Sequence, residues 1–184
     1  MQRLKGIVVP IVTPFDDSGR VDTEALKSLC DYLIDHGVHG LYPCGTTGEA
    51  VLLTDEERKN VAEVTVRHVG GRVPVFIHVG AASTRSAMDL AKHAVGIGAH
   101  GIAAVTPYYF KLSQEALILY YEQIVSVLPS DYPFYLYNIP SCTGNDVTPA
   151  TVGYLAQEYP NVVGIKNSMS DILRAQEYLN CREG

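Results

Sequence analysis

Short apolar runs recur along the chain at a nearly constant spacing, and this spacing limits the folds open to it. The runs start about 30 residues apart, which is the length of one strand followed by one helix. Each run is continuously apolar, as expected of parallel strands that are covered on both faces. The six runs are Gly6–Val12, His39–Cys44, Val73–Val79, Gly101–Val105, Pro133–Tyr137 and Val162–Lys166.

The segments between the runs carry signals of helix starts and helix ends. Thr54 and Glu57 form a capping-box pattern, and Thr148 stands before Pro149, a residue suited to the first position of a helix. Serine residues are expected to cap three further helices: Ser83, Ser113 and Ser170. Glycines stand where helices are expected to end: Gly37, Gly70, Gly71 and Gly98. The sequence therefore predicts six strand–helix units in series.

Two α/β architectures accept such a series: an open doubly wound sheet and a closed (β/α)8 barrel, the TIM barrel. A dinucleotide-binding open sheet would show GxGxxG after its first strand, where this chain reads Val12-Thr13-Pro14-Phe15. The barrel is therefore favoured. Because a barrel needs eight units in about 250 residues, we expect residues 1–184 to form about the first six units of a single barrel domain, incomplete at its C-terminus.

Composition excludes several classes of partner. The chain has 14 basic and 20 acidic residues, a net charge of −6, and no basic run, which disfavours nucleic acid and anionic membranes. No apolar stretch approaches the roughly 20 residues of a membrane span, and the first residues do not resemble a signal peptide. We therefore expect a cytoplasmic protein that binds neither nucleic acid nor membranes.

Cysteine and histidine give no sign of a disulfide framework or a metal site. The four cysteines lie far apart without a CxxC pair, so reduced thiols are expected. The six histidines show no HExxH and no pairing with cysteine at zinc spacing.

Chemistry in such barrels collects at the C-terminal ends of the strands, and two neighbouring runs end in reactive side chains. Lys166 follows Val162–Ile165 without a break. A lysine in apolar surroundings favours its neutral amine, which attacks a carbonyl to form a Schiff base; alternatively, Lys166 extends to water. Tyr137 either transfers protons there or is a core aromatic residue. Tyr135 shares the face of Tyr137 but lies farther from the strand end.

Two loops at other strand ends are also candidates. Gly45, Thr46 and Thr47 offer backbone N–H groups and hydroxyls that suit a small carboxylate, although the segment also reads as a plain turn. Tyr108 and Tyr109 form an aromatic pair in a loop, which indicates an interface or a substrate wall.

Taken together, these motifs resemble the pyruvate-dependent class I aldolases of the dihydrodipicolinate synthase / N-acetylneuraminate lyase family. The likeness covers essentially the whole chain, and the order of the motifs at successive strand ends makes it specific. The motifs are Thr13-Pro14-Phe15, Gly45-Thr46-Thr47-Gly48-Glu49, Thr106-Pro107-Tyr108-Tyr109, Tyr137-Asn138-Ile139-Pro140 and Gly164-Ile165-Lys166.

The resemblance implies a (β/α)8 barrel that assembles as a homotetramer or homodimer and acts on pyruvate or another 2-oxo acid. Lys166 matches the family's Schiff-base lysine, and Tyr137 matches its proton-transfer tyrosine. Thr46 and Thr47 match the pair that holds the pyruvate carboxylate and, in the synthases, relays protons. Tyr109 matches the tyrosine that a neighbouring subunit adds to that relay. This chemistry implies no metal or organic cofactor.

One position distinguishes members of the family. The synthases usually carry an arginine two residues beyond the proline of Tyr-Asn-x-Pro, where it pairs with the carboxylate of the aldehyde substrate. Cys142 stands there in this chain and cannot form that forked contact. We interpret Cys142 as a small residue of the substrate wall rather than a reactive thiol.

Cys142 therefore favours a lyase for a longer hydroxylated 2-oxo acid, such as N-acetylneuraminate or a 2-keto-3-deoxy sugar acid. The alternative within the family is 4-hydroxy-tetrahydrodipicolinate synthase, which joins pyruvate to aspartate semialdehyde in lysine biosynthesis. An alternative of another class is a truncated barrel without catalytic activity. A phosphate-binding barrel isomerase would need a glycine-rich site after strands 7 and 8, beyond the end of this sequence.

Overall fold

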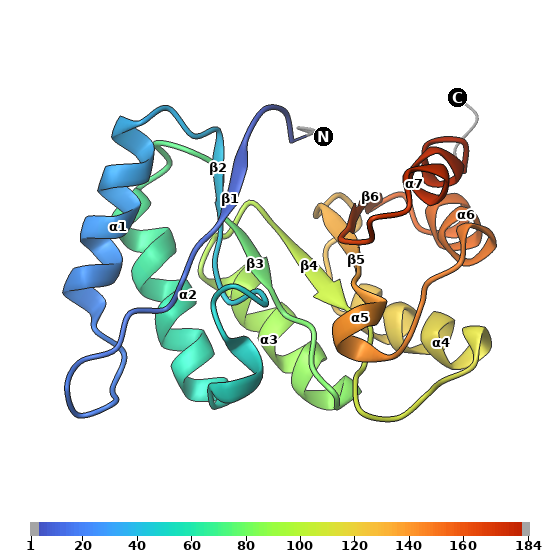
Figure 1. Cartoon of the computed structure of the whole chain (residues 1–184), viewed down its shortest axis with the longest axis horizontal. Helices are drawn as coiled ribbons and strands as arrows, with labels where there is room; N and C mark the ends of the chain where they lie inside the picture. Colours follow the sequence, from blue (N-terminus) through green and yellow to red (C-terminus); the bar gives the residue numbers. More distant parts are fainter. Residues whose placement is uncertain (1–3, 182–184) are drawn as a thin grey trace. The chain divides into compact units, whose positions relative to one another are not determined.

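Parallel strands alternate with helices through the computed structural model, which describes residues 4–181 (Figure 1). Contacts divide these residues into two units. The N-terminal unit comprises residues 4–78 and 93–101, and the C-terminal unit comprises residues 79–92 and 102–181. Each of the six predicted apolar runs overlaps a strand, so the strand–helix repeat read from the sequence is confirmed.

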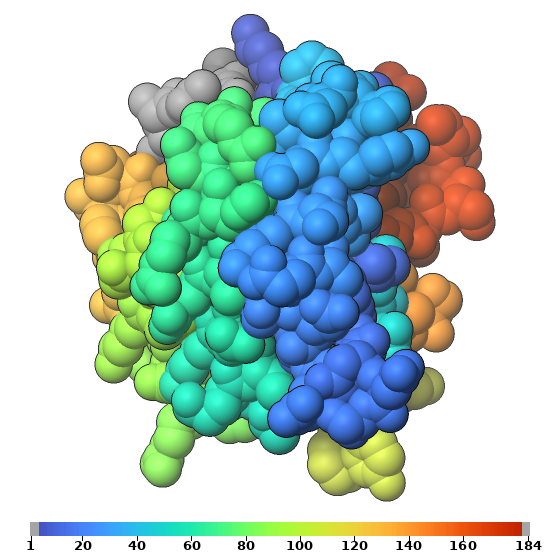
Figure 2. Space-filling view, turned by 90° about the vertical axis from the view of Figure 1, so that its left-hand side faces the viewer, coloured from blue at the N-terminus to red at the C-terminus, as the bar shows by residue number. Residues whose placement is uncertain are grey.

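The N-terminal unit is built on short parallel strands. Its elements are β1 (Val8–Pro10), α1 (Thr23–Asp35), β2 (Gly40–Tyr42), the 3-10 turn η1 (Ala50–Leu52), α2 (Asp55–Val69) and β3 (Phe76–His78). Val9 of β1 pairs with Leu41 of β2, and Leu41 also bridges to Val75 next to β3. Figure 2 shows α1 and α2 side by side on one face of the unit. The carboxylate of Asp31 links them by accepting from His68 of α2, at 2.9 Å.

The C-terminal unit carries the remaining strands. Its elements are β4 (Gly101–Val105), α4 (Gln114–Val125), β5 (Phe134–Asn138), α5 (Pro140–Thr143), α6 (Pro149–Glu158), β6 (Val162–Asn167) and α7 (Ile172–Leu179). Helix α3 (Thr84–Gly96) begins in this unit, and its last turn belongs to the N-terminal unit. Strand β5 pairs in parallel with β4 on one side and β6 on the other.

The core of the C-terminal unit lies between its sheet and its helices. Every residue of β4 is buried, and Phe134 of β5 packs against Tyr121 of α4 with ring centroids 6.1 Å apart. Most of β6 is only half-buried. No helix within residues 4–181 combines the length and apolarity that crossing a membrane requires.

The structure confirms most of the predicted helix caps and corrects one. Thr54 and Glu57 form the capping box of α2, and Ser113 and Thr148 cap α4 and α6 through their side chains. Ser170 was predicted to cap the last helix, but this is wrong. Asp171 is the cap, because its carboxylate accepts from the first free backbone N–H groups of α7, those of Leu173 and Arg174.

A short helix occupies a segment that reads as a loop in the sequence. Helix α5 begins at Pro140, whose missing N–H costs nothing at the first helical position. It ends at Thr143, and the next residue, Gly144, adopts a positive φ of 74°. The four helical residues include Cys142, so this candidate residue sits on a short helix and not in a loop.

Replacing Thr54 with alanine is expected to lower the free energy of unfolding by about 1 kcal/mol, because the backbone N–H of Glu57 loses its cap. Urea denaturation followed by circular dichroism measures the change. Ser28→Ala in α1 is the matched control, because the Ser28 hydroxyl only bonds back to the carbonyl of Glu24 within its own helix. Equal losses in the two variants would contradict the capping role.

Candidate active site

The register of β5 and β6 places Tyr137 directly beside Lys166. The Lys166 Nζ lies 3.5 Å from the centroid of the Tyr137 ring and donates a hydrogen bond to Ser168 Oγ at 3.1 Å. The backbone N–H of Ser168 in turn donates to the carbonyl of Asn138, at 2.9 Å. The amine therefore has an aromatic face and a hydroxyl as neighbours.

A register shift between Phe134 and Tyr135 makes this pairing possible. Phe134 pairs with Val162, whereas Tyr135 pairs with Gly164, so one residue of β6 is passed over. The Tyr135 ring lies over Gly164, where an added Cβ would come within 2.8 Å of Tyr135 Cε1. Gly164 thus leaves room for one tyrosine while Lys166 stands beside the next.

A buried polar network closes the end of β5. Asn138 is fully buried and donates through Nδ2 to the carboxylate of Asp146 at 2.9 Å and to the hydroxyl of Tyr178 at 3.0 Å. Its Oδ1 accepts from the backbone of Val147. Arg174 of α7 pairs with the same Asp146 at 2.8 Å. This network fixes the strand end beside Tyr137. No sequence pattern signals it, because the contacts depend on how the segment after β5 and helix α7 pack against the strand.

The predicted carboxylate loop is a tight turn in the N-terminal unit. Thr46 and Thr47 are exposed, whereas Gly45 and Gly48 are buried. A Cβ on residue 48 would lie 3.0 Å from the carbonyl oxygen of Ile11, which explains why glycine is needed there. Glu49 adopts a positive φ of 57°. The turn thus presents the two threonines outward.

Residues that sequence analysis did not assign to the site brace both ends of this loop. Thr13 donates to the carbonyl of Gly48 at 2.7 Å. At the other end, the ring Nδ1 of His78 contacts the carbonyl oxygen of Cys44 at 2.7 Å, and the buried Arg58 donates to the carbonyl of His78 at 3.0 Å. The sequence offered no signal for these contacts except the Thr13-Pro14-Phe15 motif.

The aromatic loop after β4 differs in detail from the prediction. The exposed pair is Tyr109 and Phe110, with 88% and 71% of their surface accessible, whereas Tyr108 is half-buried. The rings of Tyr109 and Phe110 meet edge to face, with centroids 4.9 Å apart. Tyr109 also has a positive φ of 82°, a conformation that L side chains rarely adopt. The surrounding structure must therefore hold this loop.

Asn145 is the residue that holds the aromatic loop. Its buried side chain donates to the carbonyls of Pro107 and Phe110, each at 2.8 Å, and accepts from the backbone of Leu112 at 2.8 Å. One amide group therefore satisfies three backbone groups on either side of Tyr109.

Replacing Asn145 with alanine is expected to lower the free energy of unfolding by about 1–3 kcal/mol, because three backbone groups lose their partner. Hydrogen–deuterium exchange should also accelerate in residues 107–112. Asn180→Ala at the end of α7 is the control, and it should leave exchange in the loop unchanged. Unaltered loop exchange in the Asn145 variant would contradict this role.

All four cysteines are free thiols in different surroundings. Burial raises the pKa of Cys30 to about 11 and that of Cys44 to about 12, so their reactive thiolates are scarce at neutral pH. Cys142 is exposed on α5.

Iodoacetamide at pH 8 is therefore expected to alkylate the Cys142 peptide at least tenfold faster than the peptides of Cys30 and Cys44, because a thiol with a pKa of about 11 is almost wholly protonated there. Peptide mapping by mass spectrometry measures the three rates. Urea-unfolded protein is the control, and it should label all three alike. Similar rates in the folded protein would contradict the burial argument.

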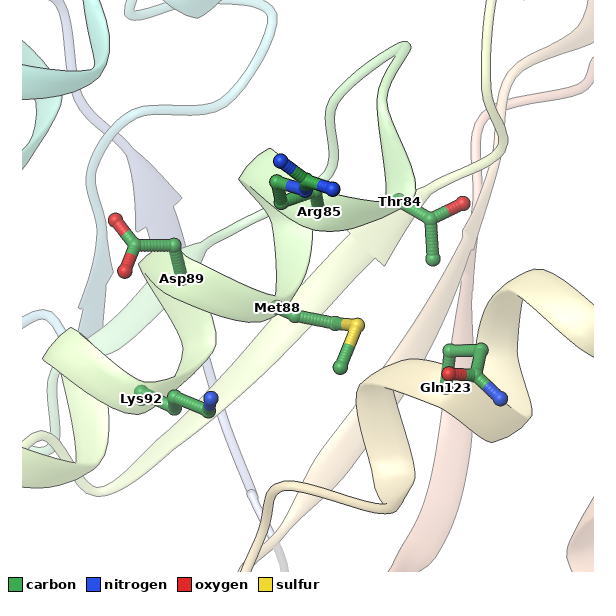
Figure 3. Close-up of a pocket in the computed structure, with 6 residues that line it drawn as sticks. All are labelled: Thr84, Arg85, Met88, Asp89, Lys92 and Gln123. Carbon is green, nitrogen blue, oxygen red and sulfur yellow. The ribbon is translucent and has the colours of Figure 1, made fainter.

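A further pocket lies apart from these residues. It has a volume of about 480 Å³ and lies between α3 and α4 in the C-terminal unit (Figure 3). Its lining residues are Thr84, Arg85, Met88, Asp89, Lys92 and Gln123. None of the predicted site residues lines it. Within residues 4–181, no group of three or more His, Cys, Asp or Glu side chains is placed to hold a metal ion.

The predicted residues are thus brought together in two groups. Lys166 and Tyr137 are in contact within the C-terminal unit, which also carries Tyr109 and Cys142. Gly45, Thr46 and Thr47 form one turn of the N-terminal unit. An amine and a phenol at the carboxyl ends of adjacent parallel strands are the arrangement of a site for carbonyl chemistry in a strand–helix fold.

Comparison with known proteins identifies the family. Residues 3–183 match the model of the dihydrodipicolinate synthetase family, and the chain belongs to that family. It is 41% identical over 174 residues to a 4-hydroxy-tetrahydrodipicolinate synthase of Nitratidesulfovibrio vulgaris (strain DP4), covering 95% of this chain and 59% of the relative. It is also 41% identical over 180 residues to a probable 2-dehydro-3-deoxy-D-pentonate aldolase of Escherichia coli (strain K12). That match covers 98% of this chain and 59% of the relative.

A solved structure supports the fold assignment. The chain matches YagE, a prophage protein of the dihydrodipicolinic acid synthase family from E. coli K12 solved in complex with pyruvate, with a TM-score of 0.92 and 39% identity. The match covers 96% of this chain and 58% of YagE. The chain therefore spans about three fifths of the length of these relatives. The prediction that it forms part of a TIM-barrel fold is confirmed.

Proposed function

We propose that the chain is the Schiff-base-forming part of a pyruvate-dependent class I aldolase, a carbon–carbon lyase built on one barrel domain. The observation that carries the proposal is the contact between Lys166 Nζ and the Tyr137 ring at the ends of β5 and β6. Family membership and the pyruvate complex of YagE support it.

Lys166 acts as the nucleophile in the proposed reaction. The amine of Lys166, which lies beside the Tyr137 ring, releases a proton to solvent, and the neutral amine attacks the ketone of a 2-oxo acid. The carbinolamine then loses water to give an iminium ion. The hydroxyl on C4 then gives up its proton and the bond between C3 and C4 breaks. The electron pair of that bond moves into the iminium, so that an aldehyde leaves and an enamine remains. Protonation and hydrolysis release pyruvate and restore the amine.

Tyr137 and the threonine turn support this nucleophile. Tyr137 moves protons to and from the carbinolamine and the hydroxyl of the cleaved bond. Gly45, Thr46 and Thr47 bind the pyruvate carboxylate and bring the carbonyl within reach. In the synthase variant of the reaction, Thr46 and a neighbouring subunit's Tyr109 relay protons. These roles involve no metal or organic cofactor.

We favour a sugar-acid substrate, either N-acetylneuraminate or a 2-keto-3-deoxy sugar acid. Cys142 stands where a synthase would carry the arginine for its aldehyde carboxylate, and a thiol lacks the charge and the forked donors for that task. The aldolase among the relatives agrees with this choice. The second candidate is 4-hydroxy-tetrahydrodipicolinate synthase. Another relative, which is also 41% identical to this chain, carries that name. The two candidates are distinguished by the rates at which the protein joins pyruvate to aspartate semialdehyde and to the aldehyde formed from a sugar acid.

Two further proposals concern how the protein assembles and where in the cell it works. We propose a homotetramer or homodimer in the cytoplasm, with Tyr109 as the residue that crosses between subunits. Its exposure, at 88% of its surface, supports that role. A candidate of another class is a barrel fragment without catalytic activity.

Borohydride added in the presence of pyruvate is expected to trap a reduced pyruvyl adduct on the Lys166 peptide, measured by intact mass and peptide mapping. Lys166→Arg should abolish the adduct because guanidinium is not a nucleophile. Lys111→Arg is the matched control and should retain it. Folded wild-type protein that traps no pyruvate would contradict the proposal and favour the inactive fragment.

Tyr137→Phe keeps the ring beside Lys166 but removes the phenol. We expect turnover to fall by about 10²- to 10⁴-fold, the usual worth of a positioned proton-transfer group. Adduct formation should slow but still reach completion, because the amine is intact. Steady-state rates and the time course of trapping measure both effects. Unchanged turnover would assign proton transfer to another group.

A further inference from the structure

We propose that His78 is a positioning residue, which fixes the bend at Cys44 and so holds the carboxylate-binding turn in its working conformation. Arg58 is the second member of this brace. This inference rests on the proposed function, because it concerns how the turn at Gly45–Thr47 is prepared for the carboxylate of pyruvate.

The bend itself needs support from outside the turn. Cys44 has a φ of 60°, a left-handed conformation that costs energy for a residue with a Cβ. Cys44 as a whole residue is buried, with 1% of its surface exposed, so its carbonyl also needs a donor from the protein.

His78 supplies that donor and holds the preceding residue too. Its backbone N–H donates to the carbonyl of Pro43 at 3.2 Å, and its ring Nδ1 lies 2.7 Å from the carbonyl oxygen of Cys44. Because a carbonyl can only accept, Nδ1 carries the hydrogen, which sets the tautomer of the ring. Two successive carbonyls at the start of the turn are thus bound by one residue of β3.

Arg58 completes a closed ring of hydrogen bonds. The Cys44 thiol donates to the carbonyl of Arg58 at 3.5 Å, Arg58 Nη2 donates to the carbonyl of His78 at 3.0 Å, and the His78 ring donates to the carbonyl of Cys44. Arg58 and His78 are each only 4% exposed. The ring therefore joins α2, β3 and the end of β2 beneath the turn, and it excludes water from all three contacts.

Tyr42 connects His78 to the turn, because its ring contacts both His78 and Gly45. The rings of Tyr42 and His78 meet edge to face with centroids 6.1 Å apart. Gly45 lies on the same Tyr42 ring, so close that an added Cβ would be 2.9 Å from Tyr42 Cε1. With Cys44 and Gly45 both held, the backbone N–H groups that follow are preorganised, and binding a carboxylate then costs less conformational entropy.

The test compares two substitutions of His78 that differ in one donor. His78→Asn places an amide N–H near the position of Nδ1, whereas His78→Phe keeps a ring but removes the donor. The first measurement is hydrogen–deuterium exchange in residues 44–50. The second is the pyruvate concentration that gives half of the maximal borohydride-trapped adduct on Lys166.

We expect His78→Phe to accelerate exchange in the turn and to raise the half-saturating pyruvate concentration, each by roughly tenfold, the effect of losing one buried hydrogen bond. The maximal adduct should be unchanged, because Lys166 and Tyr137 are untouched. His78→Asn should resemble the wild type in both measurements. His93→Phe is the matched control: His93 pairs with Glu63 at 2.9 Å, away from the turn, and its loss should leave both readouts unchanged.

Two results would overturn the proposal: wild-type behaviour of folded His78→Phe, or equal impairment of His78→Asn and His78→Phe. If His78→Phe does not fold, the same comparison is made at Arg58, which donates to the carbonyl of His78. Arg58→Met removes that donor, whereas Arg58→Lys keeps one. If wild-type protein traps no pyruvate, the proposed function fails by itself, and exchange in residues 44–50 still decides whether His78 holds the turn.

Discussion

The parallel register of β5 and β6 is the constraint on which the candidate site depends. It sets Lys166 beside Tyr137, and it does so only because one residue of β6 is passed over between Phe134 and Tyr135. Without that shift, Tyr137 would stand opposite Ile165. Since neighbouring residues of a strand point to opposite faces, the lysine would then lie on the other side of the sheet from the phenol.

Buried polar groups, rather than apolar packing alone, fix the segments around this pair. Asn138 closes the end of β5, Asn145 holds the loop of Tyr109, and His78 binds the bend at Cys44. Each forms hydrogen bonds with backbone or side-chain groups that are buried or partly buried. The residues proposed to meet substrate are therefore held by other buried side chains, as precise placement on a loop requires.

Much of the fold could be predicted because its determinants are local. The predicted apolar runs form strands in the structure. Helix caps were predictable at Thr54, Ser113 and Thr148, because a cap needs only the backbone groups two or three residues ahead. The wrong cap at Ser170 arose where Asp171, an equally good acceptor, follows directly. Helix α5 was missed because four residues are too few to show a helical period, although Pro140 and Gly144 bound it.

By itself, the sequence determined the order of strands and helices, the strand-end positions of Lys166 and Tyr137, and the motifs that mark the family. These follow from period, caps and residue types, which are properties of adjacent positions. Only the tertiary structure decided the shifted register, the exposed pairing of Tyr109 with Phe110 and the ring of bonds through Cys44, Arg58 and His78. Each of these joins backbone or side chains whose distance and direction are set by packing between elements, and a linear pattern does not encode them.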